Sequence, residues 1–76
     1  ISQEKMESDE RKNLLIKAID ELPKKQKTAL TLNKFEDLPY KEIATIMDIS
    51  VTETGVLISR AKNKLQKKLV EYFKKY

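Results

Sequence analysis

Apolar residues recur at intervals of three or four along much of the chain, which is the spacing of one face of an α-helix. The first such run consists of Leu14, Leu15, Ala18, Ile19 and Leu22. It predicts an amphipathic helix over residues 9–22, with Ser8 as a candidate cap. The preceding polar stretch has no such pattern, so residues 1–8 are predicted to be a frayed N-terminal segment and residues 9–76 the folded domain.

Two Leu-Pro pairs, Leu22-Pro23 and Leu38-Pro39, divide the next part of the chain. Proline disfavours helix in the residue before it and suits the first position of a following helix. A second helix is therefore predicted over residues 23–35 and a short third helix over residues 40–47. The positions expected to be buried in them are Ala29, Leu30, Leu32, Phe35, Ile43, Ala44 and Met47.

The segment Asp48-Ile49-Ser50 is predicted to be a tight connection between two helices. Asp48 tolerates a left-handed conformation, Ile49 is expected to be buried, and Ser50 with Glu53 fits a capping box. A long fourth helix follows, to about residue 74. Its expected inward stripe is Thr54, Ile58, Ala61, Leu65, Leu69 and Phe73.

These elements predict an all-α, four-helix domain that ends in a helix-turn-helix, comparable to the winged-helix class of DNA-binding domains but without a wing. A short helix braced against a capped longer one lets the second helix protrude into a DNA major groove. The outward side of the fourth helix would then present Thr52, Gly55, Val56, Ser59, Arg60 and Asn63.

The composition argues against catalysis. The chain has neither histidine nor cysteine, which removes the commonest general base and the thiolate ligands of zinc. No acid–base or nucleophile constellation is visible, so we expect no enzyme, no cofactor and no small-molecule substrate. No apolar run reaches the ~20 residues of a membrane span, so no membrane partner is expected.

Charge alternates in sign along the chain. Residues 1–22 carry 4 basic and 6 acidic side chains, residues 23–35 carry 4 and none, residues 36–59 carry 1 and 5, and residues 60–76 carry 7 and 1. The last block, with a net +6, is typical of a surface that binds a polyanion such as nucleic acid. Lysines that only solvate a helix face are the alternative.

Several separated motifs together resemble one family. They are Leu22-Pro23-Lys24-Lys25-Gln26-Lys27, Leu32, Phe35-Glu36-Asp37-Leu38-Pro39-Tyr40-Lys41-Glu42-Ile43-Ala44, Met47-Asp48-Ile49-Ser50-Val51 and Ser59-Arg60-Ala61-Lys62-Asn63-Lys64-Leu65. In order and spacing they are similar to region 4 of bacterial sigma factors, and most similar to the extracytoplasmic-function (ECF) group of the sigma-70 superfamily.

The resemblance implies a cytoplasmic protein that recognises promoter DNA at the −35 element and docks on the flap of the RNA polymerase β subunit. Many members also bind an anti-sigma factor. It further implies that the chain is a piece of a sigma factor, since the domain for the −10 element is absent from this sequence. The alternatives are a protein-interaction module with little DNA affinity of its own and another helix-turn-helix regulator.

The resemblance also places candidate DNA contacts. Tyr40 and Lys41 stand where the family approaches the DNA backbone, and Arg60 is the strongest single candidate because a guanidinium grips a guanine edge or a phosphate. An ion pair is the alternative for Arg60. Many members carry basic residues at the positions of Gly55 and Leu57, so this chain offers fewer charges there; Gly55 either permits a close approach to DNA or marks a weaker DNA contact.

The C-terminal apolar residues Val70, Tyr72 and Tyr76, together with Leu57, have two possible roles. They either face polymerase or an anti-sigma factor, or they pack against the first helix, which is the preferred interpretation.

Overall fold

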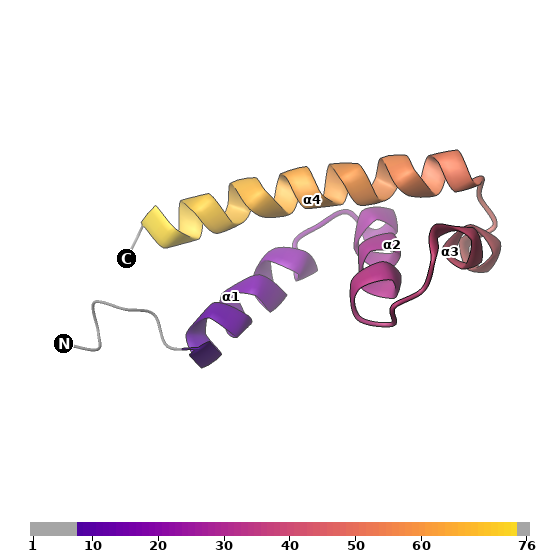
Figure 1. The fold of residues 1–76 in the computed structure, drawn as a ribbon. Helices are drawn as coiled ribbons and strands as arrows, with labels where there is room; N and C mark the ends of the chain where they lie inside the picture. Colours follow the sequence, from indigo (N-terminus) through magenta and orange to yellow (C-terminus); the bar gives the residue numbers. More distant parts are fainter. Residues whose placement is uncertain (1–7, 75–76) are drawn as a thin grey trace.

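The computed structural model describes residues 8–74 and folds them into four helices (Figure 1). They are α1 (Ser8–Asp20), α2 (Lys24–Lys34), α3 (Tyr40–Met47) and α4 (Val51–Lys74). No strand occurs within residues 8–74, which confirms the all-α prediction. Most of the predicted frayed segment, the side chain of Ser8 as a cap, the side chain of Phe73 and Tyr76 lie outside the described part.

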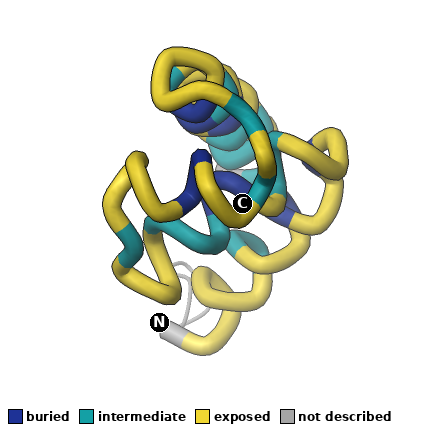
Figure 2. The backbone as a smooth tube through the Cα atoms, turned by 90° about the vertical axis from the view of Figure 1, so that its right-hand side faces the viewer, coloured by how far each residue is buried: buried dark blue, intermediate teal, exposed yellow. Residues whose placement is uncertain are grey.

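The long helix α4 is the common support of the other three. Helices α1, α2 and α3 lie side by side along one flank of α4, with α3 at its N-terminal end and α1 near its C-terminal end (Figure 1). The predicted inward stripe is buried at Thr54, Ile58 and Ala61, which have no exposed surface, and half-buried farther along at Leu65 and Leu69. With Leu30 and Ile43, the three fully buried residues form the centre of the core, and Figure 2 marks the buried positions in dark blue along the backbone.

Helix α3 begins at Tyr40 as predicted, whereas α2 begins at Lys24, one residue later than predicted. Both prolines are N-cap residues, Pro23 of α2 and Pro39 of α3, with φ of −54° and −71°. An N-cap residue contributes its carbonyl to the first turn, so a proline there loses nothing by lacking an N–H. The carbonyl of Pro23 accepts from the Lys27 N–H at 2.8 Å, and that of Pro39 accepts from the Ile43 N–H at 3.1 Å.

Two predicted helix ends were too late. Helix α1 ends at Asp20 because the residue before Pro23 is disfavoured in helix, although Leu22 stays buried in the turn. Helix α2 ends at Lys34, and Phe35, which was predicted to be buried, is 58% exposed. The chain turns away at Asp37, whose φ is 60°, and Leu38 instead packs against the core. Ile49 is half-buried, less than predicted.

Candidate nucleic-acid interface

The turn between α3 and α4 is built by local backbone chemistry. Asp48 adopts the left-handed conformation with φ 56° and ψ 49°. The Ile49 N–H donates to the Ala44 carbonyl at 3.0 Å and the Asp48 N–H to the Thr45 carbonyl at 3.3 Å. This pair of bonds is a Schellman motif, which satisfies the last carbonyls of α3 and stops the helix. The predicted arrangement of a short helix, a tight turn and a long helix is confirmed.

The start of α4 is fixed by Ser50. Its hydroxyl oxygen accepts from the Glu53 N–H at 2.9 Å, which is the serine half of the predicted capping box. Its carbonyl accepts from the Thr54 hydroxyl, also at 2.9 Å. Thr54 is fully buried, so this bond satisfies a polar group inside the core. Ser50 therefore fixes where α4 begins through two bonds to its first turn.

We call the exposed side of α4 that lies opposite Thr54 and Ile58 the outer face of α4. Its five exposed residues are Thr52, Val56, Ser59, Arg60 and Asn63. All five were predicted to face outward, and the structure brings them together on one helix face. The alternative role for Arg60 was an ion pair with an acidic side chain. Arg60 makes no such pair within residues 8–74.

The sixth predicted residue, Gly55, is only half-exposed because the ring of Tyr40 covers it. A Cβ atom built on Gly55 would lie 3.6 Å from Cε2 of Tyr40, an ordinary contact distance. Tyr40 begins α3, remains 37% exposed, and thus borders the outer face from the neighbouring helix. Lys41 is exposed beside it. The structure therefore brings Tyr40 next to α4, and it leaves Lys41 exposed at the start of α3.

A groove adjoins the outer face at the position of Arg60. It has a volume of about 320 Å³ and lies between the first turn of α2 and the middle of α4. Its lining residues are Gln26, Arg60, Asn63, Lys64 and Lys67. The sequence indicated the lysines only as a basic block, and it held no signal for Gln26, whose place depends on how α2 crosses α4.

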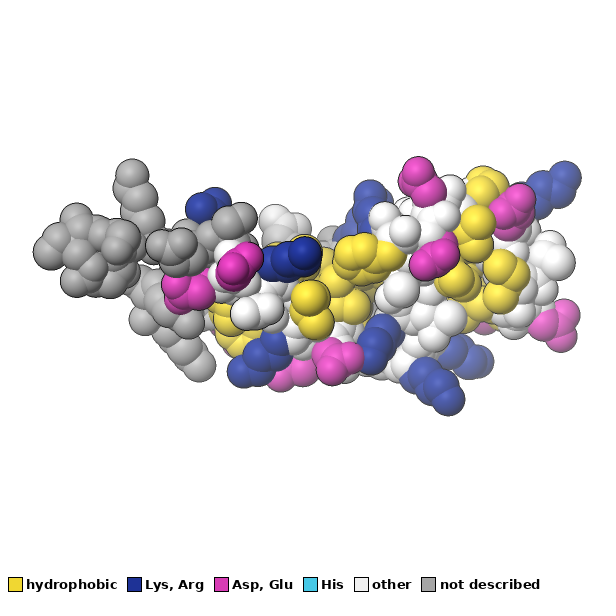
Figure 3. All heavy atoms as spheres, turned by 90° about the horizontal axis from the view of Figure 1, so that it is seen from below, with side chains coloured by type: hydrophobic (Ala, Val, Ile, Leu, Met, Phe, Trp, Pro, Cys, Tyr) yellow, Lys and Arg dark blue, Asp and Glu magenta, His cyan; other side chains and the backbone are white. Residues whose placement is uncertain are grey.

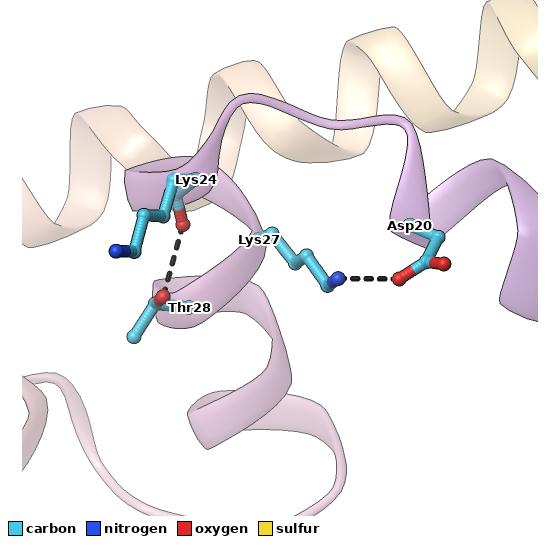
Figure 4. Close-up of polar contacts among 4 residues, drawn as sticks. All are labelled: Asp20, Lys24, Lys27 and Thr28. Carbon is cyan, nitrogen blue, oxygen red and sulfur yellow. Dashed lines mark hydrogen bonds and ion pairs between the residues drawn. The ribbon is translucent and has the colours of Figure 1, made fainter.

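The lysines at the start of α2 have different surroundings. Lys27 is paired with Asp20 at the end of α1, across the junction that Pro23 creates (Figure 4). The carbonyl of Lys24 accepts from the Thr28 hydroxyl at 2.9 Å, and the ammonium group of Lys24 points away from the ion pair. The basic cluster predicted here is thus partly neutralised by Asp20.

A second cavity is apolar and is enclosed by α1, α2 and α4. It has a volume of about 250 Å³ and is lined by Leu15, Ile19, Leu30, Lys34, Phe35, Lys62 and Leu65. Hydrophobic side chains gather where α1 meets α2, with both basic and acidic side chains around them (Figure 3). The exposed ring of Phe35 belongs to this surface.

The C-terminal half of α4 holds α1 through one polar cluster. The Tyr72 hydroxyl donates to the Glu21 carboxylate, and Lys68 Nζ lies 3.3 Å from the same oxygen. The Lys17 ammonium stands 5.2 Å from the centre of the Tyr72 ring. The hydrogen bond from Tyr72 lowers the pKa of Glu21 and, with burial, raises the pKa of Tyr72. This confirms the preferred interpretation, packing on the first helix, for Tyr72, whereas Val70 is 49% exposed.

Within residues 8–74, no group of three or more acidic, histidine or cysteine side chains is placed to hold a metal ion. None of the four helices has both the length and the apolar content that a membrane crossing requires.

Fold and surface together define a small helix-turn-helix domain, in which α3 and α4 are the two helices of the motif and α4 carries an exposed polar face. A family model described as Sigma-70, region 4 matches residues 12–65, most of the chain. The chain belongs to this family.

Curated relatives agree with the family. The chain is 38% identical over 64 residues to the ECF RNA polymerase sigma-E factor of Haemophilus influenzae, covering 84% of this chain and 34% of that protein. It is 39% identical over 61 residues to the RNA polymerase sigma-H factor of Pseudomonas aeruginosa, covering 80% and 32%. The Escherichia coli sigma-E factor is 34% identical over 64 residues, with 84% and 34% covered. The chain thus spans about a third of the length of these relatives.

Proposed function

We propose that this domain binds promoter DNA at a −35 element, by placing the outer face of α4 in the major groove, and that it does so as part of an RNA polymerase sigma factor. It acts by binding alone, without catalysis or cofactor. The observation that carries this proposal is the contrast along one helix: Thr54, Ile58 and Ala61 are fully buried, while Arg60 stands exposed among polar neighbours.

The chemistry of the outer face suits direct contact with bases. The Arg60 guanidinium matches the O6 and N7 acceptors of guanine, and the Asn63 amide matches the N6 and N7 edge of adenine. The Val56 side chain is 41% exposed and offers an apolar contact to a thymine methyl group. Thr52 and Ser59 supply hydroxyl groups that bond to bases or phosphates.

The dimensions also fit. A helix with its side chains is ~10–12 Å wide, and the major groove of B-DNA is ~12 Å wide. In a helix-turn-helix the first helix crosses the DNA backbone while the second lies in the major groove. Here the first helix is α3, and Tyr40 and Lys41 lie at its start. Contacts from these two residues position the domain without discriminating sequence.

The test is DNA binding by the 76-residue chain, with sequences first selected from a pool of randomised duplexes. Arg60→Ala is expected to weaken binding to the selected duplex by roughly 1–3 kcal/mol and to relax the preference at one base pair. Fluorescence anisotropy measures the affinity, and circular dichroism checks that the helices persist.

A matched control separates base recognition from general charge. Lys62→Ala also removes one positive charge from α4, but Lys62 lines the apolar cavity rather than the outer face. It is expected to weaken binding to all duplexes slightly and equally. If Arg60→Ala left both affinity and sequence preference unchanged in a folded domain, Arg60 would not be a base contact.

A second candidate function is supported by the apolar cavity with Phe35. We propose that this surface docks the flap of the RNA polymerase β subunit, or an anti-sigma factor, through an apolar helix with acidic flanks that face Lys34 and Lys62. Phe35→Ala is expected to weaken polymerase binding while DNA affinity stays unchanged. A chain that binds polymerase with no salt-sensitive affinity for DNA would favour this function over the first.

A further inference from the structure

We propose that the groove between α2 and α4 holds a phosphate group of the DNA backbone, next to the bases that the outer face of α4 contacts. This inference rests on the proposed DNA-binding function and extends its contact surface to Gln26, Lys64 and Lys67. These residues are outside the helix-turn-helix contacts described above. The groove adds affinity and orientation, and it carries no sequence preference.

The first support is the arrangement of positive charge. Arg60, Lys64 and Lys67 succeed one another at intervals of four and three residues, so their side chains leave the same side of α4. All three line one groove of about 320 Å³. Three cations that converge on a concave surface suit an anion with several oxygen atoms, such as a phosphodiester.

The second support is that no acidic side chain neutralises this groove. Its lining residues include neither aspartate nor glutamate, and the first turn of α2 contains no acidic residue. Within residues 8–74, the ion pairs of lysines with carboxylates involve Lys27 and Lys68, not Lys64 or Lys67. Glu71 lines a neighbouring hollow together with Lys67, but no ion pair joins the two within residues 8–74. Arg60 and Lys64 line the groove without an acidic neighbour in its wall.

The third support is a polar atom in the wall of the groove. The carbonyl oxygen Oε1 of Gln26 is buried and has no hydrogen-bond partner within the described part of the chain. A buried acceptor calls for a donor, and the donors of the same groove are the amide of Asn63 and the cations of Arg60, Lys64 and Lys67. A cation that bonds to Gln26 is held at the wall, with its remaining N–H groups turned to the anion.

The fourth support is continuity with the outer face. Arg60 and Asn63 belong both to the outer face and to the groove. At a rise of ~1.5 Å per residue, Lys67 lies ~10 Å beyond Arg60 along the helix axis. The DNA major groove is ~12 Å wide, so a helix that leaves it passes the bordering DNA strand over a comparable distance. The protein groove between α2 and α4 therefore lies where that DNA strand is expected to pass.

The test compares two double variants of the 76-residue chain. Lys64→Gln with Lys67→Gln removes two charges from the groove. Lys34→Gln with Lys62→Gln removes two charges from the border of the apolar cavity, outside the groove. Affinity for the selected duplex is measured from 50 to 400 mM salt, and the slope of log K against log salt is compared.

The groove variant is expected to lower the magnitude of this slope by ~0.9, the contribution of the one phosphate contact that it loses. The control variant is expected to change it by less than ~0.5. The sequence preference of the groove variant, measured on duplexes with single base changes, should equal that of the unaltered chain, because phosphate contacts position the protein without specifying sequence.

Duplexes shortened base pair by base pair from each end then locate the contact. Removal of one terminal phosphate is expected to weaken the unaltered chain and leave the groove variant unaffected. Equal slopes for the two double variants would overturn the groove while leaving the proposed function intact. Failure of the unaltered chain to bind any selected duplex would overturn both.

Discussion

The ring of Tyr40 on α3 lies over Gly55 on α4, and the space between them accommodates one more carbon atom at an ordinary contact distance of 3.6 Å. The glycine is thus not required for the packing of the two helices. Gly55 has a helical φ, so its conformational freedom is not used either. What glycine does at this position is lower the intrinsic stability of the first turns of α4.

Gly55→Ala is therefore expected to raise the free energy of unfolding by about 1 kcal/mol, because alanine is the better helix former and its methyl group meets no clash. Urea denaturation followed by circular dichroism measures the change. Ser59→Ala, on the same face of the same helix, serves as the control and should give a smaller gain. A lower stability for Gly55→Ala would mean that Tyr40 sits closer to the backbone than described.

The left-handed conformation of Asp48 predicts a reversal of the usual preference for alanine over glycine. With φ at 56°, Asp48→Gly should be more stable than Asp48→Ala by about 1 kcal/mol. At Thr45, inside α3, the alanine variant should be more stable than the glycine variant, by a similar free energy. The four variants are compared by urea denaturation. The same order at both positions would contradict the Schellman geometry.

Removal of the cap at Ser50 is expected to destabilise the domain. Ser50→Ala leaves the Glu53 N–H without its acceptor and should cost about 1 kcal/mol of unfolding free energy. Ser50→Asp keeps an acceptor in place and should cost much less. Because the first two turns of α4 carry Thr52 and Val56, loss of the cap is also expected to weaken DNA binding more than denaturation alone explains. Equal stability of the two variants would show that the hydroxyl bond is dispensable.

The contact between Tyr72 and Glu21 predicts how stability changes with pH. The Tyr72 hydroxyl lowers the pKa of Glu21 from its ordinary 4.5, so the stabilisation is present above pH 4.5 and is lost as the pH falls through the lowered pKa. The pKa of Tyr72 is raised above its ordinary 10.0, so the same contact is lost as the pH rises through that raised pKa.

Tyr72→Phe is expected to return the pKa of Glu21 toward 4.5, since it removes the largest cause of the shift. A carbon-detected NMR titration of the Glu21 carboxyl measures the pKa. Tyr40→Phe removes a hydroxyl that makes no hydrogen bond to Glu21, and it should leave the titration unchanged. An unaltered pKa in Tyr72→Phe would assign the shift to Lys68 instead.

Local backbone structure was predictable where one or two neighbouring residues determine it. Asp48 and Ser50 show this, because a left-handed residue followed by a capping serine specifies the turn without any distant contact. The inward stripe of α4 was predictable for a similar reason, since the period of the helix alone separates Ile58 from Ser59.

Features that depend on the crossing of two helices were not predictable. Phe35 fits the period of α2, but the helix ends one residue before it and the ring is left exposed. The approach of Gln26 to Lys64, and of Tyr40 to Gly55, depends on angles that no periodicity contains. Glu21 and Tyr72 are 51 residues apart in sequence, and neither has a local pattern that indicates the other.

The attachment of α1 has a consequence for the order in which the domain opens. Helix α1 packs on α4 through its buried residues Ala18 and Ile19 and through the exposed Glu21 cluster, whereas α2 and α3 pack on each other as well as on α4. Amide protons of α1 should therefore exchange with deuterium before those of α2 and α3. A protein that captured the detached helix would uncover the apolar cavity yet leave the DNA-facing half of α4 folded and in place.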